Sequence, residues 1–184
     1  MLSAYAAAAR ALPLDGFLPR CAALGFDPLR LAAEFSVPLE TVFRRLAHLP
    51  ASDGHPEFGY LQVDGSGGVL FRKQLSTLNL PRFSSGCPLW PVYRCFGQPG
   101  QPLRSMMTTP TGETYLTYSI AKQQLMTEFG LPPSLTGAMI FTPDFASFLP
   151  RAERQALAQL EVGLHCSVCP RQGCTSRRSA YILG

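Results

Sequence analysis

Three cysteines stand close together near the C-terminus, at Cys166, Cys169 and Cys174. Two residues separate the first pair and four separate the second, so three thiolates on one short loop can converge on a single metal centre. A tetrahedral site needs a fourth ligand from elsewhere, and Cys87 in the segment Gly86-Cys87-Pro88-Leu89-Trp90 is our candidate. The sequence therefore predicts a four-thiolate site. The alternative is that these cysteines are buried or disulfide-forming thiols.

The identity of the metal stays open between zinc and an iron–sulfur cluster. Zinc binds four thiolates readily and often fixes a loop to a distant element. However, the cysteines do not form the paired C-x2-C units of a zinc ribbon, and both Cys87 and Cys169 are followed by proline. One distant cysteine with a compact trio also suits a [4Fe–4S] cluster, which we slightly prefer. His165 is too close along the chain to Cys166 to be expected on the same ion.

The other cysteines, Cys21 and Cys95, lie on apolar helical patterns and are predicted to be core residues. Apolar positions at helical spacing predict a helix over residues 88–96. Cys87 would then lie at or just before a helix N-terminus, where the dipole lowers the pKa of a thiol and favours a thiolate ligand.

The composition is that of a globular protein. The chain has 184 residues, of which 46% are hydrophobic and 15% charged, and its net charge of +4 is too small to argue for nucleic-acid binding by itself. No run approaches the roughly 18 apolar residues of a membrane span. The alanine-rich start lacks a basic region before it and is interpreted as a helix rather than a secretory signal. We therefore expect a cytoplasmic protein with reduced cysteines.

The first 50 residues are predicted to be helical. Residues 1–16 and 17–27 each have the pattern of one helix, and residues 29–46 read as two helices around a short turn, with Ser36 capping the second. This is the pattern of a helix-turn-helix, although an ordinary helical hairpin packs in the same way. In the first case the second helix would expose Glu40, Thr41, Arg44 and Arg45, and Thr41, Arg44 and Arg45 are the candidate DNA contacts.

After residue 50 the pattern changes to period two. Residues 58–64 and 69–75 flank a glycine-rich turn and predict a β-hairpin, and residues 103–109 and 113–120 predict a second. Residues 138–142 predict one more strand, and helices at 88–96 and 150–162 would pack on the sheet. The predicted fold class is α+β, with a mostly antiparallel sheet resembling a sensor domain. Residues 1–50 would form the helical segment, and residues 51–184 the sensor domain closed by the cysteine site.

The order of these motifs resembles a known family. The helix pair ending Val42-Phe43-Arg44-Arg45-Leu46, the hairpin at 58–75, Gly86-Cys87-Pro88-Leu89-Trp90 and Cys166-x2-Cys169-Pro170-Arg171-x2-Cys174 together resemble the C-terminal domain of the short-chain fatty-acyl-CoA regulators. These are bacterial transcription factors in which a helix-turn-helix and a metallopeptidase-like domain precede this region. These 184 residues contain no His-Glu-x-x-His motif, so we expect them not to include the metallopeptidase-like domain.

The resemblance implies a sensing domain of a transcriptional regulator, with an acyl-CoA or related effector. The effector would meet aromatic and basic side chains, although aromatic residues also serve ordinary core packing; the candidates are Trp90, Tyr93, Arg72, Lys73, Arg82 and Arg104. The protein would act on DNA directly or through a partner or missing domain. A homodimer is a possible form of the protein. The alternative function is a DNA-binding or protein-interaction module that uses residues 29–47, with a structural zinc. No catalytic set is present, so we do not expect an enzyme.

Overall fold

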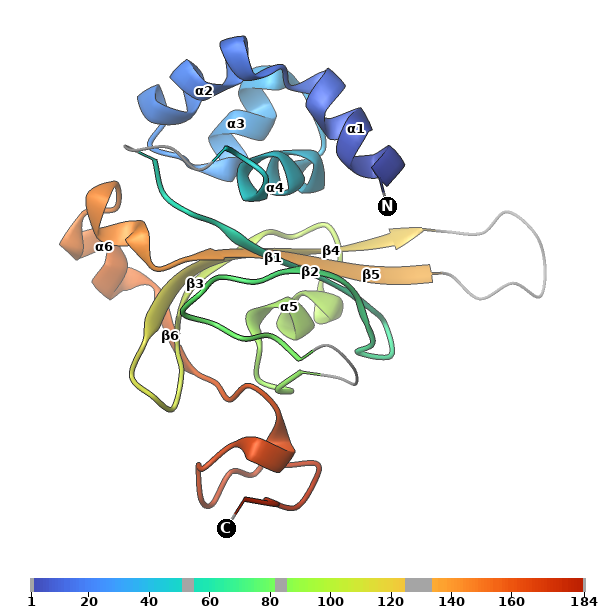
Figure 1. Ribbon diagram of the computed structural model, residues 1–184, viewed down its shortest axis with the longest axis vertical. Coiled ribbons are helices and arrows are strands. Elements are labelled where there is room, and N and C mark those ends of the chain that lie inside the picture. Colours follow the sequence, from blue (N-terminus) through green and yellow to red (C-terminus); the bar gives the residue numbers. More distant parts are fainter. Residues whose placement is uncertain (1, 51–54, 82–85, 125–133, 184) are drawn as a thin grey trace.

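A computed structural model describes residues 2–50, 55–81, 86–124 and 134–183, which form one six-stranded sheet with helices on both faces (Figure 1). The strand order is β2-β1-β5-β4-β3-β6, and only β3 and β6 pair in parallel. Both predicted hairpins are present, and the fifth strand starts earlier than predicted. The strands are β1 (Gly59–Asp64), β2 (Val69–Lys73), β3 (Leu103–Thr108), β4 (Thr114–Gln124), β5 (Ser134–Thr142) and β6 (Ala158–Glu161).

The central strand β5 is buried on both faces of the sheet. Because successive side chains on a strand point to opposite faces, Ala138 and Ile140 join the core on the helical side, whereas Met139 and Phe141 join the core on the other side. Both cores contain mainly aliphatic and aromatic side chains from distant parts of the chain. The sheet therefore separates two hydrophobic cores.

Four helices cover one face of the sheet (Figure 1). They are α1 (Leu2–Ala11), α2 (Leu14–Ala23), α3 (Pro28–Phe35) and α4 (Leu39–Ala47). The predicted helix over 1–16 was wrong at its end, because Pro13 is the N-cap of α2 and the chain starts a second helix at once. Asp15 lies in the first turn of α2, where a carboxylate is favoured by the helix dipole.

The predicted cap of the fourth helix was also wrong. Ser36 has a φ of 51° and ends α3 in the left-handed conformation, and its N–H donates to the carbonyl of Ala33 at 3.3 Å. α4 begins after Pro38 without a side-chain cap. Asp27 is the side-chain cap of α3: its carboxylate accepts hydrogen bonds from the backbone N–H groups of Leu29 and Arg30.

The two α-helices that follow β2, α5 and α6, are shorter than predicted. α5 covers only Pro91–Arg94 and continues as a 3-10 turn over Cys95–Gly97. α6 (Arg151–Ala156) stops where a helix to residue 162 was predicted, because Ala158–Glu161 leaves it to form β6 beside β3. Two further 3-10 turns, Asp144–Ser147 and Cys166–Val168, complete the described elements.

The helical segment and the sheet share one core. Leu12, Phe17, Phe43 and Leu46 from the helices lie in the same cluster as Ile140 from β5. The predicted boundary falls next to residues 51–54, which lie outside the described residues. The two parts are joined by this packing, whatever the position of the boundary between them.

Replacing Leu46 by alanine tests this shared core. Leu46 is 1% exposed, so Leu46→Ala should lower the free energy of unfolding by about 2–5 kcal/mol, the usual cost of a cavity in a core. Urea denaturation followed by circular dichroism measures it, with Leu70→Ala as the control because Leu70 is 44% exposed. One transition should report both helix and sheet; two separate transitions would contradict a common core.

Candidate metal centre and ligand cavity

Cys87 is held against the segment that follows β6. Its backbone N–H donates to the carbonyl of Leu164 at 3.0 Å, and its own carbonyl accepts from the N–H of Trp90 at 3.0 Å. The indole N–H of Trp90 donates to the carbonyl of Gly163 at 2.8 Å. These bonds join the turn before α5 to residues more than 70 positions later in the chain.

Gly163 lies between two of the thiols. Its N–H donates to the Sγ of Cys87 at 3.2 Å. A Cβ at this position would lie 2.8 Å from the Sγ of Cys169 and 3.7 Å from the Sγ of Cys87. Any side chain here would collide with Cys169, so the present position of that thiol against the backbone depends on glycine.

All four predicted ligands line one small pocket. Cys87, Cys166, Cys169 and Cys174 surround it together with Gly163, His165 and residues of the C-terminal tail. All six cysteines of the chain are free thiols. In the part of the chain that the structure describes, no three His, Cys, Asp or Glu side chains are already spaced to hold a metal ion. The metal site therefore stays a prediction, although its four residues share one pocket.

The side chain of Arg177 holds the cysteine loop in shape. Its guanidinium donates to the carbonyls of Cys166 at 2.7 Å, Cys169 at 3.0 Å and Arg171 at 2.5 Å. The backbone N–H of Arg178 donates to the Sγ of Cys166 at 3.4 Å. The loop is therefore folded around one cation by its own carbonyl groups.

Burial raises the pKa of the Cys87 thiol, although the N–H groups of Gly163 and Leu89 act in the opposite direction. The expected lowering of this pKa by a helix N-terminus was wrong, because α5 begins only at Pro91 and Cys87 is buried before it. Cys21 and Cys95 are core residues as predicted, and burial raises their pKa values to about 12 and about 11. A cation close to Cys87 would be needed to favour its thiolate.

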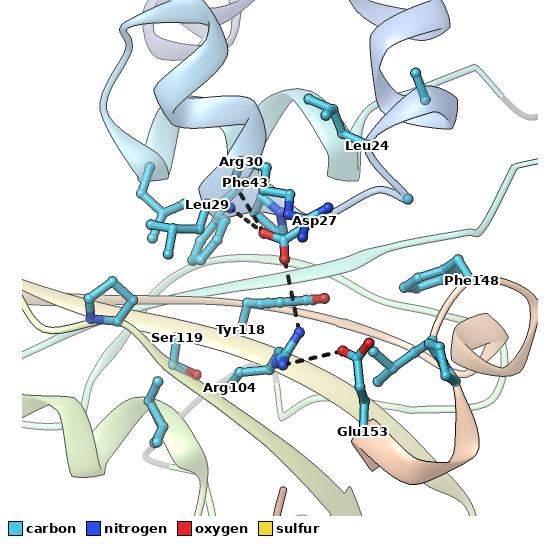
Figure 2. Close-up of a pocket in the computed structure, with 18 residues that line it drawn as sticks. Leu24, Asp27, Leu29, Arg30, Phe43, Arg104, Tyr118, Ser119, Phe148 and Glu153 are labelled. Carbon is cyan, nitrogen blue, oxygen red and sulfur yellow. Dashed lines mark hydrogen bonds and ion pairs between the residues drawn. The ribbon is translucent and has the colours of Figure 1, made fainter. Parts of the chain in front are cut away.

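A separate cavity of about 510 Å³ opens where the helical segment meets the sheet and α6 (Figure 2). Arg104 at the start of β3 lies in its polar part, with one guanidinium nitrogen 3.9 Å from Asp27 and another 3.6 Å from Glu153. The hydroxyl of Tyr118 lies beside Arg104, and burial raises the pKa of this tyrosine to about 12. The phenol is therefore protonated at neutral pH.

The chain matches the C-terminal family of the short-chain fatty acyl coenzyme A regulators over residues 49–183. It belongs to this family. The resemblance seen in the sequence is thereby confirmed. Two curated relatives are a propionyl-CoA carboxylase regulator of Cereibacter sphaeroides, 30% identical over 192 residues, and the HTH-type transcriptional regulator RamB of Mycobacterium tuberculosis, 28% identical over 190 residues. Each match covers 96% of this chain but only 39% of the relative.

A solved structure of a Mycobacterium tuberculosis transcriptional regulator shares the fold. It superposes with a TM-score of 0.76 at 24% identity, covering 97% of this chain and 56% of that one. The chain thus spans about 39% of the length of the two curated relatives and 56% of the solved one. Among its described residues, every helix is too short or too polar to cross a bilayer.

In this family member, α4 does not present the predicted DNA-binding face. Arg45 is only 5% exposed, and its Nε donates to the carbonyl of Leu12 at 2.7 Å. Arg44 is half-buried, donates to the side chain of Gln62 at 2.8 Å, and lies over the ring of Tyr60. Thr41 is half-buried as well. The expected exposure of Arg45 was wrong, because α4 packs between the other helices and the sheet like a helix of an ordinary hairpin.

The predicted ligand-binding residues are not gathered in one place. Arg104 lines the large cavity, whereas Tyr93 donates its hydroxyl to the carbonyl of Gly67 at 3.1 Å near the β1–β2 turn. Arg72 and Lys73 donate to the carbonyls of Leu80 and Phe58. Trp90 is buried against Gly163, and Arg82 lies outside the described residues.

Sequence reasoning missed the other residues of the cavity. Asp27, Arg30 and Glu153 come from segments that no local pattern brings together. The available signal was Asp27, whose position before Pro28 marks a helix start. Nothing in the spacing of apolar residues indicated that this helix start would face Arg104.

Gly163→Ala tests the close packing of the two thiols. The added methyl group would overlap Cys169, so the variant should lose about 1–3 kcal/mol of unfolding free energy, as overpacked sites do. Urea denaturation gives the value. Gly97→Ala is the matched control, since a Cβ at Gly97 meets nothing within 4 Å. Equal stability of the two variants would show that Cys169 does not lie against Gly163.

Proposed function

We propose that this chain is a ligand- or redox-sensing domain of a bacterial transcriptional regulator of acyl-CoA and short-chain fatty acid metabolism, and that it carries a four-cysteine centre. The observation behind the centre is that Cys87 and the C-terminal cysteines line one pocket although they come from distant segments. The regulatory role is supported by relatives whose names describe transcription regulators, one of them a regulator of propionyl-CoA carboxylase.

The surroundings of the four thiols suit a metal centre with negatively charged ligands. Cys87 and Cys166 each accept a backbone N–H, from Gly163 and Arg178, and such donors stabilise sulfur that carries negative charge. Since burial raises the pKa of Cys87, its thiol would be protonated without a nearby cation. Metal binding removes this proton and offsets the cost of burial.

A [4Fe–4S] cluster is our first choice and a zinc ion is the alternative. All four donors are thiolates, which both centres accept, and a zinc site of this kind has no open position for substrate. A cluster would supply one-electron chemistry and sensitivity to oxidants, whereas zinc would close the loop structurally. In both cases Gly163 and Arg177 set the approach of the ligands, and Trp90 fixes Gly163.

An acyl-CoA or related metabolite is the proposed effector, and DNA is the proposed target of the complete regulator. Because α4 is packed inside the domain, DNA contact is assigned to the remaining part of a longer regulator or to a partner, as the helix-turn-helix in the name of one relative suggests. The sensing domain would pass its state to that part.

Anaerobic purification tests the centre directly. The chain should absorb broadly in the visible range and contain iron and acid-labile sulfide in equal amounts, and chelation or air oxidation should bleach it. Cys87→Ser and Cys169→Ser should each remove most of the metal and loosen the C-terminal loop, because three ligands hold it less tightly. Absorption spectra and metal analysis give both results.

Cys95→Ser is the control, since Cys95 is a core residue away from the pocket. It should keep the metal content of the parent protein. A colourless protein with one zinc ion per chain would overturn the cluster but keep the four-cysteine site. A protein that binds neither metal after anaerobic reconstitution, or a Cys87→Ser variant with full metal content, would overturn the site itself.

A further inference from the structure

The cavity between the helical segment and the sheet holds cationic groups that their partners do not saturate. The nitrogens of Arg104 lie 3.9 Å from Asp27 and 3.6 Å from Glu153, longer than the roughly 2.7–2.9 Å of a charge-assisted hydrogen bond. A guanidinium carries five N–H donors, so Arg104 retains donors for a further partner. Arg30 is an exposed residue that also lines the cavity, and none of the ion pairs among the described residues involves it.

The two acidic groups of the cavity are less available. One oxygen of Asp27 accepts the N–H groups of Leu29 and Arg30 as the cap of α3, at 2.9 and 3.2 Å, and the other faces Arg104. Glu153 also faces Arg104 (Figure 2). The two arginines carry more N–H donors than the two carboxylates can accept, so an incoming anion meets unused donors on Arg104 and Arg30.

The remaining wall of the cavity is apolar. Leu24, Leu39, Phe43 and Leu149 line it, and Phe43 is fully buried beneath it. A volume of about 510 Å³ is within the range of roughly 300–1,000 Å³ that small-molecule sites occupy. An apolar wall next to two arginines matches a molecule with a charged head and a hydrocarbon body.

We infer that this cavity binds a small carboxylate with an apolar tail, whose head meets Arg104 and Arg30 and whose tail packs on Leu24, Leu39 and Phe43. The inference deepens the proposed sensing role and rests on it, but it does not depend on the cysteine centre. The hydroxyl of Tyr118 lies beside Arg104, whose guanidinium it accepts from, and its own hydrogen is left to be donated to the head.

Because the cavity lies between the helical segment and α6, a bound carboxylate would affect the contact between these two parts. The lining of the cavity comes from the α2–α3 connection, the first turn of α3, α4, the start of β3, the middle of β4 and the segment that begins α6. A carboxylate bound to Arg104 replaces part of the attraction between Arg104 and Glu153. Binding therefore acts on the contact between the helical segment and α6, the element that leads into β6 and the cysteine loop.

Calorimetric titration of the whole chain with butanoate, hexanoate and octanoate tests the site. Each methylene that enters the cavity should tighten binding about fourfold, until the cavity is filled. Arg104→Gln should weaken hexanoate binding at least about tenfold because a charged hydrogen-bond donor is lost, and Arg30→Gln should weaken it by a smaller factor. Arg30→Gln removes no ion pair of the described residues, so its effect is separate from folding.

Arg10→Gln is the matched control, an exposed arginine of α1 that does not line the cavity, and it should bind as the parent does. Butylamine, hexylamine and octylamine should not bind. Equal affinity for amines and carboxylates, unchanged binding in both arginine variants, or binding of hexanoyl-CoA with none of hexanoate would overturn the inference. Cys87→Ser should keep carboxylate binding; its loss of metal alone would then bear only on the cysteine centre.

Discussion

The parallel pairing of β6 with β3 determines whether the cysteine loop can reach Cys87. Four residues of β6 pair with Ser105–Thr108, and the N–H of Val162 extends the pairing to the carbonyl of Thr108 at 2.9 Å. Only Leu160 and Val162 on this stretch are buried, so these two side chains set the register. A slip by one residue would turn them to solvent and turn Gly163 away from Trp90 and Cys87. The thiol pocket therefore depends on a strand that is short and largely exposed.

The sheet places the two candidate sites on different sides of one strand. In β3, Met106 belongs to the core under the four helices, whereas Met107 belongs to the core around Cys87 and Trp90. Arg104 lies on the side of Met106, two residues away, and faces the cavity. Among the described residues, the lining of the cysteine pocket includes none from the helical segment, and the lining of the cavity includes none from the cysteine loop. The link between the sites is the α6–β6 segment beside β3: Glu153 of α6 lines the cavity, and Gly163, shortly after β6, lines the cysteine pocket.

The sequence allowed prediction of features that depend on local pattern or on ligand chemistry. Alternating side chains predicted both hairpins, and the number of thiolates required by one metal predicted that Cys87 would lie near the C-terminal trio. Prediction from the sequence failed where a residue's structure depends on a partner far away in the chain and no shared ligand chemistry points to that partner. The spacing of apolar residues after α6 is compatible with a helix or a strand, as at Leu157, Leu160 and Val162. This segment forms β6 because the edge of β3 offers backbone groups for pairing. Arg45 has the pattern of a surface residue, but the carbonyl of Leu12, 33 positions earlier, accepts its hydrogen bond inside the molecule.

Sequence separation between partners also explains why the cavity could not be predicted from the sequence, whereas the grouping of the four cysteines could. A set of cysteine ligands can be predicted from the sequence because a thiolate metal site needs several residues of the same type. The cavity is built from ordinary residues whose roles appear only when the loop before α3, the start of β3 and the start of α6 meet. Arg104 balances Asp27 on the helical side against Glu153 on α6, so its charge contributes to both contacts at once. Any change in the pairing of Arg104 must therefore alter the attraction that holds α6 to the helices. Since β6 follows α6 after a single residue, the register that positions Gly163 lies directly downstream of that contact.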